Sequence, residues 1–77
     1  DDAISYEAER VLAAVLLAQH RFGEAAGVAQ RLLALSPRDA WLHGVVGDAA
    51  LERGDYDAAF AAFDTMARQR PDAAAYA

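Results

Sequence analysis

The sequence of 77 residues lacks cysteine and lysine, and it contains only two prolines. Without cysteine, neither a disulfide framework nor a thiolate zinc site can stabilise so short a chain. Seven arginines stand against twelve acidic residues, so the net charge is −5. A nucleic-acid backbone or an anionic membrane attracts proteins through basic patches, and this charge balance therefore argues against both as partners.

Long hydrophobic runs are also missing. The longest apolar stretch, residues 11–18, has eight residues, whereas a membrane-spanning helix needs about 20. The first residues, Asp1 and Asp2, offer neither the basic start nor the apolar core of a signal peptide. We therefore expect a cytoplasmic protein. Because the chain does not begin with methionine, we also expect it to be a fragment of a longer one.

Alanine is the most frequent residue, and it has the highest intrinsic helix propensity. Apolar residues recur at three- and four-residue spacing in segments separated by short polar breaks. The sequence predicts helices over residues 5–19, 22–35, 37–53 and 55–70, and the start of a fifth helix over 73–77. The short connections between them predict antiparallel neighbours.

The breaks between these segments carry recognisable turn and cap signals. Gly54 predicts a left-handed turn, and His20 stands at the equivalent place in the first half, where histidine tolerates a positive φ. Ser36 followed by Pro37, with Asp39 at the third helical position, predicts a capped helix start at Pro37. The predicted buried faces are Ala8, Leu12, Val15 and Leu16; Phe22, Ala25, Ala26, Ala29, Leu32 and Leu33; Leu42, Val45, Val46, Ala49, Ala50 and Leu51; and Tyr56, Ala59, Phe60, Phe63 and Met66.

The second half of the chain repeats the first at an offset of 34 residues. The aligned pairs include Phe22 with Tyr56, Ala25 with Ala59, Ala13 with Gly47, Leu17 with Leu51 and Pro37 with Pro71. A fixed period of about 20 to 50 residues is typical of stacked repeats, and about three repeats are usually needed for stability. Two repeats and a stub leave apolar surface uncovered, so we expect further repeats or a second copy to cover it.

These residues resemble the tetratricopeptide repeat, a helical hairpin of about 34 residues. In the second repeat the small Gly47, the turn Gly54-Asp55-Tyr56, Ala59, Phe63 and Pro71 carry the resemblance; in the first, His20 replaces the turn glycine and Ala29 the aromatic residue. The resemblance implies an all-α fold of antiparallel hairpins stacked as a right-handed superhelical solenoid. It implies a single domain over 1–77, with repeats at about 6–39 and 40–73 and a further helix beginning at 74–77.

The resemblance also implies a scaffold that binds a peptide or protein segment in a concave groove lined by the first helix of each repeat. Carried over by position, the candidate groove residues are Glu7, Arg10, Ala14, Leu17, Trp41, Gly44, Asp48, Leu51 and Glu52. The family's carboxylate clamp requires asparagine where Ala14 and Val45 stand, so we expect no such clamp. One aromatic residue and three acids predict a groove suited to an apolar or basic segment.

Several alternatives stay open at this point. Trp41 either anchors a ligand or packs between the repeats. Asp39 and His43, one turn apart, could share a metal, but no third ligand accompanies them, so we expect no metal site.

The acidic side chains also allow a catalytic interpretation, but no nucleophile or phosphate loop lies near Glu7, Glu9, Asp48 and Glu52. We therefore expect neither catalysis nor a cofactor, although such repeats are often fused to catalytic domains. The alternative to a binding module is a structural segment that forms homo-oligomers through its open ends.

Overall fold

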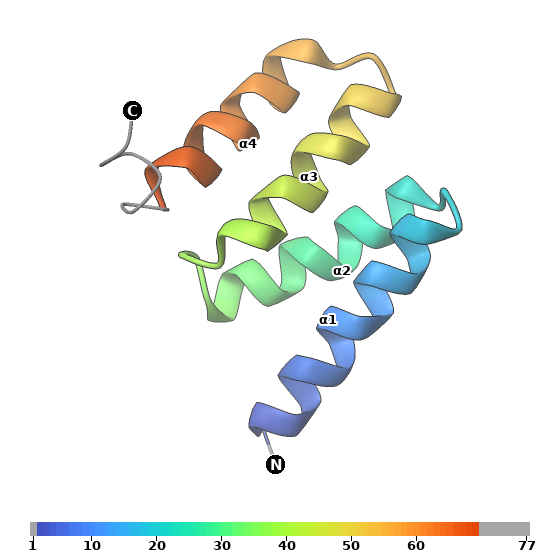
Figure 1. Ribbon diagram of the computed structural model, residues 1–77, viewed down its shortest axis with the longest axis vertical. Helices are drawn as coiled ribbons and strands as arrows, with labels where there is room; N and C mark the ends of the chain where they lie inside the picture. Colours follow the sequence, from blue (N-terminus) through green and yellow to red (C-terminus); the bar gives the residue numbers. More distant parts are fainter. Residues whose placement is uncertain (1, 70–77) are drawn as a thin grey trace.

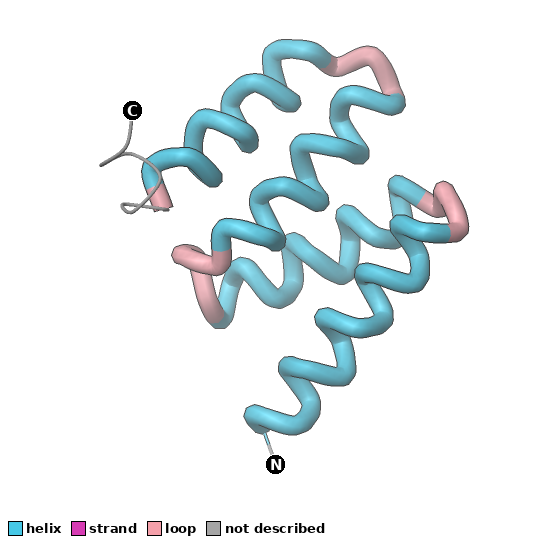
Figure 2. The backbone as a smooth tube through the Cα atoms, viewed as in Figure 1, coloured by secondary structure: helices cyan, strands magenta, loops and turns pink. Residues whose placement is uncertain are grey.

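The computed structural model describes residues 2–69, which form four α-helices. These are α1 (Asp2–Ala18), α2 (Phe22–Leu35), α3 (Ala40–Glu52) and α4 (Tyr56–Arg68). Each helix packs antiparallel against the next in chain order, and α1 and α4 form the two ends of the stack (Figure 1). Short loops join them (Figure 2). The predicted all-α fold of antiparallel hairpins is confirmed; Pro71 and the expected helix over 73–77 lie outside the described residues.

The turn after α1 has the geometry that the sequence predicts. His20 adopts a left-handed conformation with φ of 60°. The Arg21 N–H donates to the Leu16 carbonyl at 2.9 Å, and the His20 N–H donates to the Leu17 carbonyl at 3.0 Å. These two bonds form a Schellman motif, which satisfies carbonyls that the end of a helix leaves unpaired. The His20 ring also stacks on Phe22, with ring centroids 5.5 Å apart.

The turn after α3 repeats the same motif 34 residues later. Gly54 has φ of 80°, the Asp55 N–H donates to the Ala50 carbonyl at 2.9 Å, and the Gly54 N–H donates to the Leu51 carbonyl at 3.1 Å. The Asp55 side chain then caps α4 by accepting a bond from the Ala58 N–H at 3.2 Å. The repeat period in the sequence therefore reflects one backbone turn used twice.

The start of α3 differs from the prediction. Asp39, not Ser36, is the N-cap, and its side chain accepts a bond from the Leu42 N–H at 3.4 Å. Ser36 instead ends α2, because its N–H donates to the Leu32 carbonyl at 2.9 Å. The prediction that α3 starts at Pro37 is therefore wrong, and the residues from Ser36 to Asp39 form a connecting turn.

Two other helix ends also differ from the prediction. Helix α1 begins at Asp2 rather than at Ser5, because no glycine or proline interrupts the preceding residues. Helix α4 ends at Arg68, followed by the C-cap Gln69.

The main hydrophobic core lies between α1, α2 and α3. Its members are Ala13, Leu16, Ala25, Val28, Ala29, Leu32, Leu42 and Val45. The buried face of α1 is therefore not the predicted one: Ala8, Leu12 and Val15 are exposed, and Leu16 alone of the predicted four is buried. Helical spacing identifies which residues of α1 share a face, but it does not identify the face that α2 contacts. In the structure, that face carries Ala13.

At the other end of the stack, Tyr56 and Phe60 are 59% and 67% exposed, contrary to the predicted core role. Helix α4 packs on α3 through Ala59 and Ala62, and no second helix among residues 2–69 covers its outer side. Leu51, predicted to be buried, is also exposed. None of the described helices combines the length and hydropathy that crossing a bilayer requires.

The second hairpin closes through two glycines of α3. A Cβ atom on Gly47 would lie 2.5 Å from the Phe63 ring, and one on Gly44 would lie 3.1 Å from the Met66 sulfur. Gly47 therefore faces the paired helix, as predicted from the sequence. The partly buried ring of Phe63 fills the space that the missing side chain of Gly47 leaves.

Replacing Gly47 with alanine should destabilise the protein by about 1–3 kcal/mol, because the added methyl group forces the Phe63 ring to move. Gly27→Ala is the matched control. Its Cβ would meet nothing within 4 Å, so the higher helix propensity of alanine should stabilise it by about 0.5–1 kcal/mol. Urea denaturation measures both changes, and equal midpoints for the two variants would contradict this packing.

Candidate binding groove

A pocket of about 260 Å³ lies where α1, α3 and the end of α4 meet. Its lining residues are Leu17, Ala40, Trp41, Gly44, Val45, Asp48 and Met66. The structure thus brings together Leu17, Trp41, Gly44 and Asp48 from the predicted groove. Met66 was not among the predicted groove residues, because its helical spacing indicated a core position.

Trp41 combines the two roles that the sequence left open. Its side chain is half-buried and packs against the hydrophobic core, while another part of it lines the pocket. The guanidinium carbon of Arg10 lies 5.0 Å from the centroid of the tryptophan ring, which is a cation–π distance. The packing and the stacking together fix the indole at the pocket wall.

Arg10 is held by the carboxylate of Asp39 in a two-point ion pair. Its Nε lies 2.8 Å from Oδ2 and its Nη2 lies 3.1 Å from Oδ1. The Tyr6 hydroxyl donates to the same Oδ2 at 2.8 Å. Arg10, predicted as a groove cation, is therefore engaged within the protein, and the network ties α1 to the loop that precedes α3.

This network shifts the pKa values of its members. The hydrogen bonds from Arg10, followed by that from Tyr6, lower the pKa of Asp39 despite its partial burial. The hydrogen bond to Asp39 raises the pKa of Arg10. Burial is the main cause that raises the pKa of Tyr6. The structure therefore favours a charged Asp39 and Arg10 beside a neutral Tyr6.

His43 forms a structural contact. Its Nε2 lies 2.8 Å from the Pro37 carbonyl oxygen, and since a carbonyl only accepts, the ring N–H is the donor. Asp39, its proposed metal-sharing partner, is bound by Tyr6 and Arg10. Within the described part of the chain, no group of three potential metal-ligating side chains gathers.

A family model described as tetratricopeptide repeat matches residues 16–77, which is most of the sequence. The chain belongs to the tetratricopeptide repeat family. Comparison with curated proteins and with solved structures found no match. Tetratricopeptide repeats mediate protein–protein interactions, and stacked repeats of this kind present extended concave surfaces.

The other predicted groove residues of these tetratricopeptide repeats lie outside the pocket. Glu7 borders a separate, shallow hollow on α1, and Ala14, Leu51 and Glu52 are exposed. Glu9, which the sequence grouped with Glu7 as an acid, pairs instead with Arg31 of α2 at 2.6 Å. The pocket is thus lined mainly by α3, with Leu17 from α1 and Met66 from α4.

Replacing Asp39 with asparagine should lower the stability at pH 7 by on the order of 1 kcal/mol, because the charge-assisted bonds to Arg10 are lost while a capping oxygen remains. The folded-state pKa of Asp39 lies below its unfolded value of about 3.9. The ionised Asp39 therefore stabilises the fold above its unfolded-state pKa, and this contribution is lost as the pH falls through the folded-state pKa.

The difference between the wild type and Asp39→Asn should therefore shrink in urea denaturation below about pH 4. Asp57→Asn, which removes an exposed carboxylate from α4, serves as the control for a change in net charge. A gap that stays constant down to pH 2 would contradict the assigned role of Asp39.

Proposed function

We propose that this chain is a binding module, rather than a catalyst, and that it holds a protein or peptide segment in the groove between α1 and α3. The observation that supports it most is the pocket formed by Leu17, Trp41, Asp48 and Met66. Most of its lining residues belong to α1 and α3, the first helices of the two repeats, and stacked repeats bind partners on extended concave surfaces. A segment seated there would contact both hairpins at once.

The chemistry of the pocket favours an apolar side chain next to a basic one. Leu17 and Met66 supply apolar walls, and the flexible thioether of methionine adapts to different shapes. Asp48 supplies an exposed carboxylate at the rim. Because Arg10 is already paired with Asp39, the positive charge nearest Trp41 is largely neutralised. The net charge of −5 would further attract a basic segment.

Trp41 supplies the large aromatic surface from which such sites gain most of their affinity. Tryptophan is enriched among residues whose truncation costs more than about 2 kcal/mol of binding energy. The packing of Trp41 on the core and the stacking of Arg10 hold the ring in place before a ligand arrives. Binding would then cost little side-chain entropy.

Replacing Trp41 with alanine should weaken binding at least about tenfold, which corresponds to about 1.4 kcal/mol. The probe is a labelled peptide that places leucine or methionine beside arginine or lysine, followed by fluorescence anisotropy. Leu35→Ala removes an exposed, large apolar side chain outside the pocket and is the control. Unchanged affinity of a folded Trp41→Ala variant would contradict the groove assignment, and circular dichroism checks the fold.

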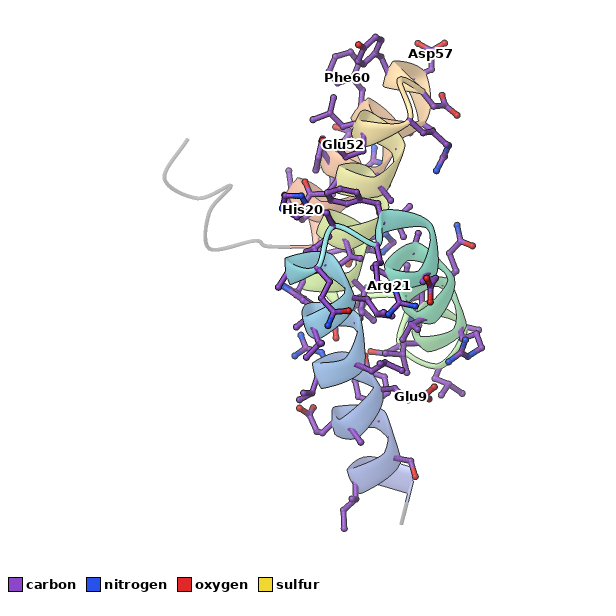
Figure 3. The ribbon with its side chains drawn as sticks, turned by 90° about the vertical axis from the view of Figure 1, so that its right-hand side faces the viewer. Glu9, His20, Arg21, Glu52, Asp57 and Phe60 are labelled. Carbon is purple, nitrogen blue, oxygen red and sulfur yellow. The ribbon has the colours of Figure 1, made fainter. Side chains whose placement is uncertain are left out.

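Replacing Asp48 with asparagine should weaken binding of the same basic peptide about two- to fivefold, because one exposed ion pair contributes up to about 1 kcal/mol. Asp57→Asn removes an equally charged, exposed side chain at the outer end of the stack (Figure 3) and should leave the affinity unchanged. The difference between the two variants should decrease with added salt. Equal affinity for a peptide with glutamate in place of its basic residues would contradict the charge preference.

A further inference from the structure

The outer side of α4 is apolar and exposed at positions that are covered in the preceding repeat. Ala26 of α2 is 7% exposed, whereas Phe60, its equivalent 34 residues later, is 67% exposed. Phe22 is half-buried and its equivalent Tyr56 is exposed. The difference arises because α3 packs on α2, whereas no helix among residues 2–69 packs on the outer side of α4. We define the α4 end face as the exposed residues Tyr56, Phe60 and Ala67.

The outer side of α1 shows the complementary difference. Val45 of α3 is 1% exposed, whereas its equivalent Val11 is 61% exposed. Ala49 is buried and its equivalent Val15 is exposed. Val45 packs in the core with residues of the preceding helix α2, and α1 has no preceding helix among the described residues. We define the α1 end face as the exposed residues Ala8, Val11, Leu12 and Val15.

The two end faces are therefore the two halves of an interface that the protein already contains between α2 and α3. We propose that a second copy of the chain stacks head to tail on the first, with its α1 end face on the α4 end face, in the geometry of the α2–α3 contact. The occupant is a second copy because it carries the matching face at the matching repeat position. Figure 1 shows α1 and α4 at opposite ends of the stack, so both contacts can form at once.

The side chains at these faces are large enough to drive association. A tyrosine and a phenylalanine each bury about 150–250 Å² when they are fully covered, and both are more than half exposed here. The contact joins two different faces, so it leaves a free α1 face and a free α4 face on every assembly. Association should consequently continue beyond the dimer as the concentration rises.

Charge gives this contact a salt dependence opposite to that of the groove. Each copy carries a net charge of −5, so two copies repel one another, and salt screens the repulsion. Self-association through apolar faces should therefore strengthen with salt. Binding of a basic peptide next to Asp48 should weaken with it, which separates the two proposals experimentally.

Light scattering and sedimentation equilibrium of the 77-residue chain, from micromolar to millimolar concentration, test the proposal. The average mass should rise from 8.2 kDa past that of a dimer. Val11→Glu and Phe60→Glu should each be monomeric alone, because each lacks one end face. Mixed together they should form a one-to-one dimer that grows no further, because each retains the face that the other lacks. Leu35→Glu adds the same charge at a site 74% exposed outside both faces, and it should associate like the wild type.

The opposite results would overturn the proposal. These are a wild type that stays monomeric, a single variant that still dimerises by itself, or two folded variants that do not associate when mixed. Circular dichroism establishes that each variant is folded. Val15→Glu and Tyr56→Glu, also at exposed positions, provide a second pair for the same mixing experiment.

Discussion

The carboxylate of Asp39 joins the two hairpins of this protein. It caps α3 through the Leu42 N–H and accepts bonds from Tyr6 and Arg10 of α1. The start of the second repeat is thereby tied to the first helix of the first repeat. Arg10, held by Asp39, in turn stacks on Trp41. Together with the shared core on α2, this side chain fixes the relative placement of α1 and α3, and with it the pocket between them.

The two hairpins reach the same packing with different residues. In the second repeat Gly47 leaves space that the Phe63 ring fills; in the first, the equivalent positions hold Ala13 and Ala29, both fully buried. A smaller residue on one helix is matched by a larger one on its partner, so the helices can pack closely in both cases. This exchange of volume explains how a degenerate sequence pattern specifies one repeated structure.

The sequence predicted the features that local patterns encode and missed those that depend on neighbours. The 34-residue period, the turns at His20 and Gly54 and the inward position of Gly47 follow from residue type and spacing, and the structure has them. The ion pair between Arg10 and Asp39 could not be predicted, because the two residues lie 29 positions apart in the sequence. For the same reason, family positions located Leu17, Trp41 and Asp48 at the pocket but could not show that Met66 completes it.

Helix α1 shows why periodicity alone assigned the wrong buried face. One side, with Ala13 and Leu16, packs in the core beside α2; a second side contributes Leu17 to the pocket; and a third exposes Val11 and Val15. A helix that is apolar on several sides has no single stripe from which its buried face can be identified. Such a composition is typical of a helix with neighbours on two sides, and the described residues supply α1 with one packed helix. The exposed valines of α1 and the exposed aromatic residues of α4 thus have the same origin: each repeat carries apolar surface on both of its ends.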